Sequence, residues 1–278
     1  MNDRVLPVSV VVPTKNSIDH LEDCLSSVTE NFPSELIVVD GDSTDDTIKI
    51  AKKFTSNIFS DKGFGISGAR FIGSRQAKEK FIAFVDSDVL LPPNALNVML
   101  REIQTSNYAV IMSPYFKVLR ASTYWSNADV RHIMYSHCLI KGTRLATFCA
   151  LFRKEVLLQY GFEFSYGGFM DDKDLGLRLL KGGQLIGYSQ VIPVHMKKQD
   201  LCAFALNSIH LGRLKTAYFK KYGFRELRNF PIVEGIFWSL YSVARGLFDM
   251  LPFFFVRSFY ETKGFLQGPP KTDVIRPQ

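Results

Sequence analysis

The sequence predicts an α/β protein with a mixed, mostly parallel sheet, helices on both faces and a helical, aromatic-rich segment at the C-terminal end. Three observations predict this class. Continuous apolar runs alternate with segments of helical spacing over the first two thirds of the chain. The first three apolar runs each end in polar or acidic residues. After residue 200, long helical stretches rich in aromatic side chains replace this alternation.

The first third of the chain supplies three strands and two helices. The strands are predicted at 8–12, 36–39 and 81–85, where β-branched and other apolar residues run without interruption. Residues 18–28 place apolar side chains on one helical face, and Ser43 begins a second helix over 47–54 as a capping residue. Ligands of such sheets bind outside the carboxyl ends of the strands, so the residues that end these runs are site candidates.

The rest of the chain gives weaker patterns. The expected order is strand, helix, helix, strand and amphipathic helix, at 148–152, 153–160, 169–182, 184–192 and 201–222. Most of the stretch 108–150 has no clear period. We expect a catalytic domain over 1–200, with halves at 1–90 and 91–200, an amphipathic helical segment over 201–266 and a loose tail over 267–278.

The composition excludes several classes of protein. With 46% hydrophobic and 22% charged residues, the chain is not a disordered, collagen-like or coiled-coil protein. The net charge of +7 is concentrated in 196–228, so a nucleic-acid partner is not expected. The four cysteines form no C-x-x-C pair, which argues against a zinc ribbon or a disulfide framework. The N-terminal residues lack the apolar region of a signal peptide.

The pair Asp86 and Asp88, directly after a predicted buried strand, is the sharpest chemical feature. Two carboxylates one residue apart can hold a hard divalent cation, which in turn holds a diphosphate. The alternative interpretation is that these aspartates are solvent-exposed residues that cap a turn. Asp40 at a neighbouring strand end, and Asp171 and Asp172 at the start of a later helix, favour a site.

The glycines of 63–68 match G-x-G-x-x-G, the pattern of a dinucleotide-binding turn. Three features argue against that interpretation. The preceding segment 55–58 is short and polar, the first strand-to-helix turn has no glycine, and the acid expected to bind a ribose is doubled. A loop that admits a nucleotide, with Arg70 facing it, agrees better with the pattern.

Taken together, these stretches resemble family 2 glycosyltransferases of the GT-A fold. The resemblance covers about residues 7–200 and keeps the order and spacing of the family. No single stretch is specific, but the set is. The four stretches are VSVVVPTKN at 8–16, ELIVVDGDSTDDT at 35–47, the segment from GAR at 68–70 to FVDSD at 84–88, and DDKDLGLRL at 171–179.

The resemblance implies a nucleotide-sugar donor and a pocket for its nucleotide. Pro13, Thr14 and Asn16 would line this pocket. Asp40 would accept a hydrogen bond from the base, and Arg70 would lie near the base or the phosphates.

The resemblance also implies a cation and a catalytic base. Asp86 would approach the ribose and the metal, and Asp88 would bind Mn²⁺ or Mg²⁺ through the diphosphate. His195 falls where relatives place a histidine near the metal, although a structural histidine is the alternative. Asp172 would be the general base. Because Asp171 stands where the family has Glu, either carboxylate could fill that role.

The implied reaction is a metal-assisted single displacement that inverts the anomeric configuration. Processive polysaccharide synthases of this family carry a Gln-x-x-Arg-Trp motif, which is absent here, so transfer of one sugar is expected. A UDP-sugar is favoured as donor, with GDP-mannose as the alternative. A nucleotidyltransferase and a catalytically dead nucleotide-binding or membrane-scaffolding module are the competing hypotheses.

The aromatic-rich segment 230–260 has no uninterrupted apolar stretch long enough to span a bilayer. Helices of 201–266 that lie in the headgroup plane are expected instead, with a helical lid or a dimer surface as alternatives. Membrane docking would favour a polyprenyl-phosphate or lipid-linked glycan acceptor. The expected location is the cytoplasmic face of a membrane, as a peripheral rather than a single-pass protein.

Overall fold

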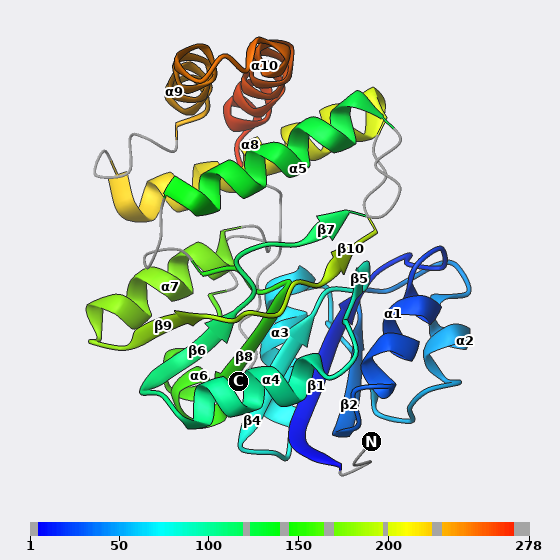
Figure 1. Ribbon diagram of the computed structural model, residues 1–278. Coiled ribbons are helices and arrows are strands. Elements are labelled where there is room, and N and C mark those ends of the chain that lie inside the picture. Colours follow the sequence, from blue (N-terminus) through cyan, green and yellow to red (C-terminus); the bar gives the residue numbers. More distant parts are fainter. Residues whose placement is uncertain are drawn as a thin grey trace. The chain divides into compact units, whose positions relative to one another are not determined.

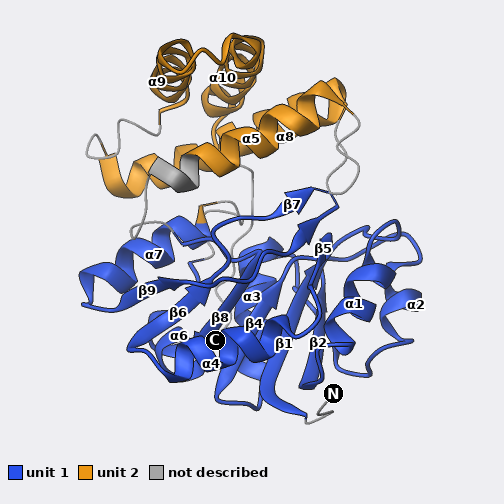
Figure 2. Cartoon of the chain, in the orientation of Figure 1, with its two compact units in different colours: residues 1–119, 136–164, 171–196 blue, residues 120–135, 165–170, 197–278 orange. Residues whose placement is uncertain are grey.

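The computed structural model describes residues 5–118, 123–139, 145–163, 170–196, 200–223 and 230–269. The chain forms two compact units, coloured separately in Figure 2. The α/β unit comprises residues 1–119, 136–164 and 171–196. The helical unit comprises residues 120–135, 165–170 and 197–278. The predicted tail over 267–278 falls almost entirely outside the described residues.

Seven strands in the described part of the α/β unit form one sheet, in the order β3-β2-β1-β4-β8-β6-β9 (Figure 1). β8 runs antiparallel to its neighbours β4 and β6, and the other pairs are parallel. This is the mixed, mostly parallel sheet that the sequence predicts. The strands are β1 (Leu6–Thr14), β2 (Pro33–Asp40), β3 (Ile58–Ser60), β4 (Phe81–Val85), β6 (Tyr108–Met112), β8 (Cys149–Arg153) and β9 (Leu185–Tyr188).

Helices cover both faces of the sheet, because successive strand residues point to opposite sides. Val10 and Val12 of β1 face one core, together with Leu25 of α1 and Leu96 of α4. Val11 faces the other core, which includes side chains of α3, α6 and α7. The helices of this unit are α1 (Leu21–Thr29), α2 (Thr47–Ala51), α3 (Gly65–Gln76), α4 (Ala95–Gln104), α6 (Lys154–Tyr160) and α7 (Asp171–Lys181).

A second, small sheet has the order β5-β10-β7, from β5 (Val89–Leu90), β10 (Val194–His195) and β7 (Lys117–Val118). It joins the chain directly after the Asp86–Asp88 segment to the segment that carries His195. Val89 pairs with His195 in antiparallel register. Neither β7 nor β6 was evident from the sequence, since both lie in the stretch without a clear period.

The predicted elements agree with the structure in type but not always in extent. The helix predicted over 47–54 ends at Ala51, and the strand predicted over 184–192 ends at Tyr188. The capping prediction for Ser43 is wrong. Asp46 occupies the N-cap position of α2 without a capping side-chain hydrogen bond, and the Ser43 hydroxyl donates instead to Asp40 Oδ1 at 2.5 Å.

The helical unit contains α8 (Leu201–Tyr222), α9 (Pro231–Ala244), a 3₁₀ turn η3 (Phe248–Met250), α10 (Leu251–Gln267) and most of α5 (Tyr124–Leu139). Its core is aromatic, with Phe204, Trp238, Phe253 and Phe254 among its buried members. Pro252 lies in the first turn of α10, where its missing N–H costs no helical hydrogen bond. Among the described helices, none combines the length and the hydropathy that are needed to cross a bilayer.

Candidate active site

The carboxyl ends of the first strands lie level with one another. Thr14 pairs with Asp40 across β1 and β2, and Asp40 pairs with Ser60 across β2 and β3. β4 lies on the other side of β1 and leads directly into Asp86. The parallel register therefore gathers the predicted nucleotide-binding residues at one edge of the sheet, as the sequence leads us to expect.

The loop after β1 is joined to the loop after β2 by hydrogen bonds. Asn16 has a left-handed backbone with φ of 46°, a conformation that asparagine tolerates. Its N–H donates to Ser43 Oγ at 2.8 Å, and its side-chain oxygen accepts from the Thr44 N–H at 2.9 Å. Both carboxylate oxygens of Asp40 accept hydrogen bonds from Ser43. These contacts hold the two loops as one surface.

Pro13 and Thr14 form the buried end of β1 beside that surface. The Thr14 hydroxyl is buried and has no hydrogen-bond partner among the residues that the structure describes. A buried polar atom without a partner is costly, so this hydroxyl is a natural contact for a bound ligand.

Arg70 joins two carboxylates from distant parts of the chain. Its Nη2 lies 3.0 Å from Asp86 Oδ1 after β4, and its Nη1 lies 3.0 Å from Asp171 Oδ2 at the start of α7. The arginine reaches this position because α3 packs closely on β1. A Cβ on Gly73, one turn later in α3, would overlap the Val11 side chain.

Burial and neighbouring charges shift the pKa values of Arg70 and Asp171 in opposite directions. Burial disfavours the charged guanidinium, but the carboxylates of Asp171, Asp86 and Asp172 outweigh it and raise the pKa of Arg70. Burial raises the pKa of the Asp171 carboxyl, and the Arg70 guanidinium opposes that rise. Arg70 therefore stays charged, and the ion pair makes the burial of Asp171 tolerable.

The two aspartates that begin α7 have different environments. Asp171 is 1% exposed and its Oδ2 is bonded to Arg70, whereas the Asp172 side chain is partly exposed. Acidic side chains in the first turn of α7 also interact favourably with the positive end of the helix dipole. Further along α7, Arg178 binds Asp174 at 2.7 Å and donates to the Gly161 carbonyl, so its guanidinium is held by contacts away from the Arg70 pair.

Asp88 and His195 lie together beside the small sheet. His195 Nδ1 is 3.6 Å from Asp88 Oδ2, and the Met196 N–H donates to the Asp88 carbonyl at 2.7 Å. Between Asp86 and Asp88, Ser87 Oγ shares a hydrogen bond of 3.0 Å with Ser17 Oγ. The strand pairing thus brings His195 to a carboxylate that is more than 100 residues away in sequence.

This pair of side chains fits the donor set of a divalent cation. A carboxylate oxygen and an imidazole nitrogen suit Mn²⁺, and Mg²⁺ is commonly held by one or two carboxylates plus substrate phosphates. Within the described ranges, no three His, Cys, Asp or Glu side chains form a metal-binding group. Asp88 and His195 would be a partial set of ligands for such a cation, which a diphosphate could extend.

Asp61 was missed in the sequence. It directly follows β3, is buried, and accepts a hydrogen bond from the Gly63 N–H at 2.8 Å. Its own N–H donates to the Asp40 carbonyl. Burial raises the pKa of its carboxyl. The signal was present, because an acid after an apolar run is the pattern that also marks Asp40 and Asp86.

A model of the family described as "Glycosyl transferase family 2" matches residues 9–161, more than half of the 278-residue chain. The chain belongs to glycosyltransferase family 2. The predicted family and enzyme class are thereby confirmed. The match includes every predicted site residue from Pro13 to Asp88, whereas Asp171, Asp172 and His195 lie beyond it.

Individual relatives also match parts of the chain. A glycosyltransferase of Rickettsia bellii, described as uncharacterized, is 33% identical over 129 residues, which are 44% of this chain and 18% of that protein. The chain thus spans less than a fifth of that relative. The UDP-Glc:alpha-D-GlcNAc-diphosphoundecaprenol beta-1,3-glucosyltransferase WfgD of Escherichia coli is 24% identical over 184 residues, covering 64% of this chain and 71% of WfgD.

Solved structures show the same fold. Glucosyl-3-phosphoglycerate synthase from Mycobacterium tuberculosis, in complex with Mg²⁺ and UDP, aligns with a TM-score of 0.53 at 18% identity. The alignment covers 77% of this chain and 78% of that one. Another structure of that synthase holds Mn²⁺, UDP and glucosyl-3-phosphoglycerate and aligns with a TM-score of 0.54. The predicted GT-A-type fold is confirmed.

Proposed function

We propose that this chain transfers a single sugar from a nucleoside-diphosphate sugar to an acceptor hydroxyl or phosphate, with inversion at the anomeric carbon. The observation that carries the proposal is the Arg70 bridge. It ties Asp86, at the nucleotide-binding edge of the sheet, to Asp171, at the start of the helix that carries Asp172. A donor-binding carboxylate and a partly exposed candidate base are thereby held in one rigid arrangement.

The donor assignment is supported by the neighbours. The structural relatives were solved with UDP, and WfgD is named for UDP-Glc, so a UDP-sugar is the first donor to test. A dolichol-phosphate mannosyltransferase of Pyrococcus furiosus is 29% identical over 120 residues, and its name specifies mannose as the transferred sugar. GDP-mannose, the alternative donor expected from the sequence, is therefore the second to test. Pro13, Thr14, Asn16 and Asp40 would line the nucleotide pocket. Arg70 is proposed to act at its margin, because both its Nη atoms are bonded to carboxylates.

Asp88 and His195, with Asp86 beside them, would hold Mn²⁺ or Mg²⁺. The cation would neutralise the negative charge that develops on the leaving diphosphate. Asp172 would accept the acceptor proton as the acceptor oxygen forms its bond to the anomeric carbon and the bond to the diphosphate breaks. Asp171 would hold the start of α7 in place through Arg70.

The proposed acceptor is lipid-linked, and the proposed location is a cytoplasmic membrane surface reached through 201–266. Support comes from the names of two relatives, which act on a diphosphoundecaprenol-linked sugar and on dolichol phosphate. A catalytically dead nucleotide-binding or scaffolding module is the alternative. It would bind the donor without turning it over.

The decisive experiment measures donor binding and turnover separately, with UDP- and GDP-sugars, Mn²⁺ or EDTA, and mixed membrane lipids as acceptor. Asp172→Asn should bind donor normally and lose about 10²–10⁴-fold in rate. Asp88→Ala should lose metal-dependent donor binding. Asp46→Asn, at an exposed position of the same unit, is the matched control and should change neither.

Absence of nucleotide-sugar binding under any metal condition would refute the proposal. Binding without turnover by the unaltered protein, for every donor and lipid fraction, would favour the scaffolding alternative. Loss of turnover in Asp171→Asn, with normal turnover in Asp172→Asn, would assign the base to Asp171 instead.

A further inference from the structure

One side of α9 is entirely apolar where it faces away from the core of the helical unit. Trp238 and Ser242 point inward, and Trp238 packs on Phe254 and His132. The exposed positions of the helix are Ile232, Ile236, Phe237, Leu240, Val243 and Ala244. Leu240 is 66% exposed and Ile236 is 56% exposed. A helix on the surface of a globular protein normally carries charged or polar residues on such a face.

Exposed apolar side chains also occur in the two elements that follow α9. Phe248 in η3 is exposed, as are Phe255 and Phe259 on α10. Large exposed apolar patches are uncommon on monomeric soluble proteins and mark interaction sites. We refer to the exposed side of α9, together with Phe248 and Phe255, as the apolar face.

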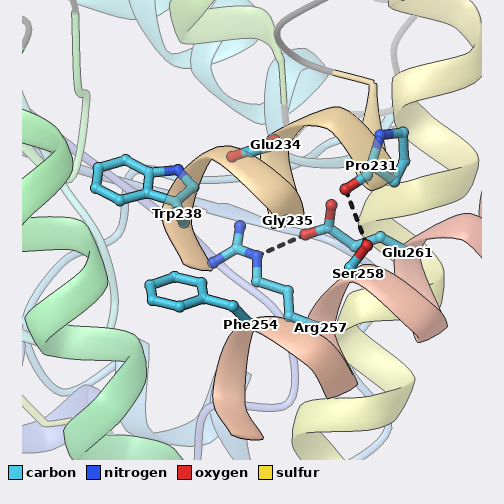
Figure 3. Close-up of a pocket in the computed structure, with 8 residues that line it drawn as sticks. All are labelled: Pro231, Glu234, Gly235, Trp238, Phe254, Arg257, Ser258 and Glu261. Atoms are coloured by element: carbon cyan, nitrogen blue, oxygen red, sulfur yellow. Dashed lines mark hydrogen bonds and ion pairs between the residues drawn. The ribbon is translucent and has the colours of Figure 1, made fainter. Parts of the chain in front are cut away.

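Most acidic groups in the described part of the helical unit are paired within that unit. Lys215 bonds Glu234 and Glu261 at 2.6 and 2.5 Å. Arg257 bonds Glu261 at 2.7 Å, as Figure 3 shows. Asp129 pairs with Arg257, and Asp249 pairs with Arg131. Four of the five carboxylates in the described part of this unit are thus in internal ion pairs.

The pocket beside this ion network is no substrate site. Pro231, Gly235, Trp238 and Phe254 line it with the charged residues (Figure 3). Its cavity volume is about 10 Å³, which is room for one ordered water. The network therefore holds the helices together and neutralises Glu234 and Glu261. The exposed cations of this unit include Arg245, Lys220 and Lys263.

We propose that the apolar face docks onto the headgroup region of an anionic bilayer, with α9 lying in the plane of the interface. Apolar and aromatic side chains at this depth gain burial, while exposed Lys and Arg meet anionic headgroups. A second copy of the chain fits less well. A two-fold dimer through this face would bring the same cationic residues of both copies together. The inference deepens the proposed function, for which it would supply access to a lipid-linked acceptor.

The test uses the full chain and vesicles of phosphatidylcholine with and without phosphatidylglycerol, in a flotation assay. Wild type should float with the anionic vesicles, and added salt should weaken the binding. The double variant Ile236→Glu/Leu240→Glu should reduce the partition coefficient at least tenfold. Leu185→Glu, at a 53% exposed leucine of β9, is the matched control and should bind as wild type does.

A second measurement tests whether the apolar face contacts the membrane. A tryptophan introduced as Phe237→Trp should shift its emission to the blue when anionic vesicles are added. Failure of the wild type to float, or equal flotation of the double variant, would overturn the proposal. A lipid-free dimer that the double variant dissociates would also overturn it, in favour of a second copy. The vesicles contain no donor or acceptor, so the flotation result does not depend on transferase activity. The double variant should retain transferase activity toward a water-soluble acceptor.

Discussion

Replacement of Arg70 by methionine should destabilise the α/β unit strongly, because it leaves a buried carboxylate without its cation. Methionine fills a similar length with apolar atoms but cannot bond Asp171 Oδ2 or Asp86 Oδ1, each now 3.0 Å from the guanidinium. The side chains of Arg70 and Asp171 are 5% and 1% exposed, whereas that of Asp86 is 25% exposed. Water can therefore compensate Asp86 in part, but not Asp171.

The expected loss is about 3–5 kcal/mol in the free energy of unfolding, the usual effect of removing one partner of a buried ion pair. Most of it should come from Asp171, since a partly exposed pair contributes about 1 kcal/mol or less. The double variant Arg70→Met/Asp171→Leu should recover most of the loss, because no uncompensated buried charge remains.

The penalty should also depend on pH. Burial already raises the pKa of Asp171 in the folded protein, and loss of the opposing guanidinium should raise it further. A carboxyl whose folded pKa is raised takes up a proton more readily in the folded state. The destabilisation should therefore shrink as pH falls from 8 towards that pKa.

The assay must report on the α/β unit. Both tryptophans, Trp125 and Trp238, lie in the helical unit, so tryptophan fluorescence would follow the wrong region. Hydrogen exchange in peptides from β1 and β4 measures the opening free energy of the central sheet directly. A penalty below about 1 kcal/mol, or one of equal size at pH 8 and pH 5, would refute the reasoning from the buried pair.

Two further predictions follow from burial and close packing. Burial raises the pKa of the Cys149 thiol to about 12 and also raises that of Cys24, whereas Cys202 is exposed. Iodoacetamide should therefore label Cys202 at pH 8 and leave Cys24 and Cys149 unlabelled until the protein is denatured, as peptide mass spectrometry can show. In the helical unit, a Cβ on Gly212 would overlap the Glu261 carbonyl oxygen of α10. Gly212→Ala should therefore lower the free energy of unfolding by about 1–3 kcal/mol, measured by urea unfolding followed by tryptophan fluorescence. An unchanged midpoint would contradict the close packing of α8 on α10.

Much of the fold can be predicted from local patterns. Apolar runs located β1, β2 and β4, and helical spacing located α1 and α8, the latter with the bounds that the structure has. These signals are local, since they depend on side-chain periods within one element. The strands β6 and β7 escaped prediction because their pairing partners, in β8, β9 and β10, lie 30 or more residues away.

Some residues of the candidate site could be identified from the sequence, whereas the environment of others was revealed only by the fold. Asp40, Asp86 and Asp88 could be singled out because each follows an apolar run, and the family resemblance added Arg70 and His195 as candidates. The sequence left Asp171 and Asp172 as alternative bases, and their different environments emerged only with the fold. Asp171 is buried against Arg70, whereas Asp172 is partly exposed. Asp61 has the same local signal as Asp40 and was overlooked because its strand is short.

By itself, the sequence determined the type of fold, the membership of family 2 and the edge of the sheet that carries the acidic residues. Periodicity and strand ends depend on residues that are close in sequence, so they can be recognised from the sequence alone. The tertiary structure alone decided which charges meet. Arg70 binds Asp171 across 101 positions, and Asp88 lies beside His195, because strand register and helix packing bring distant segments together. Burial then gives each charge its environment, which no spacing in the sequence specifies.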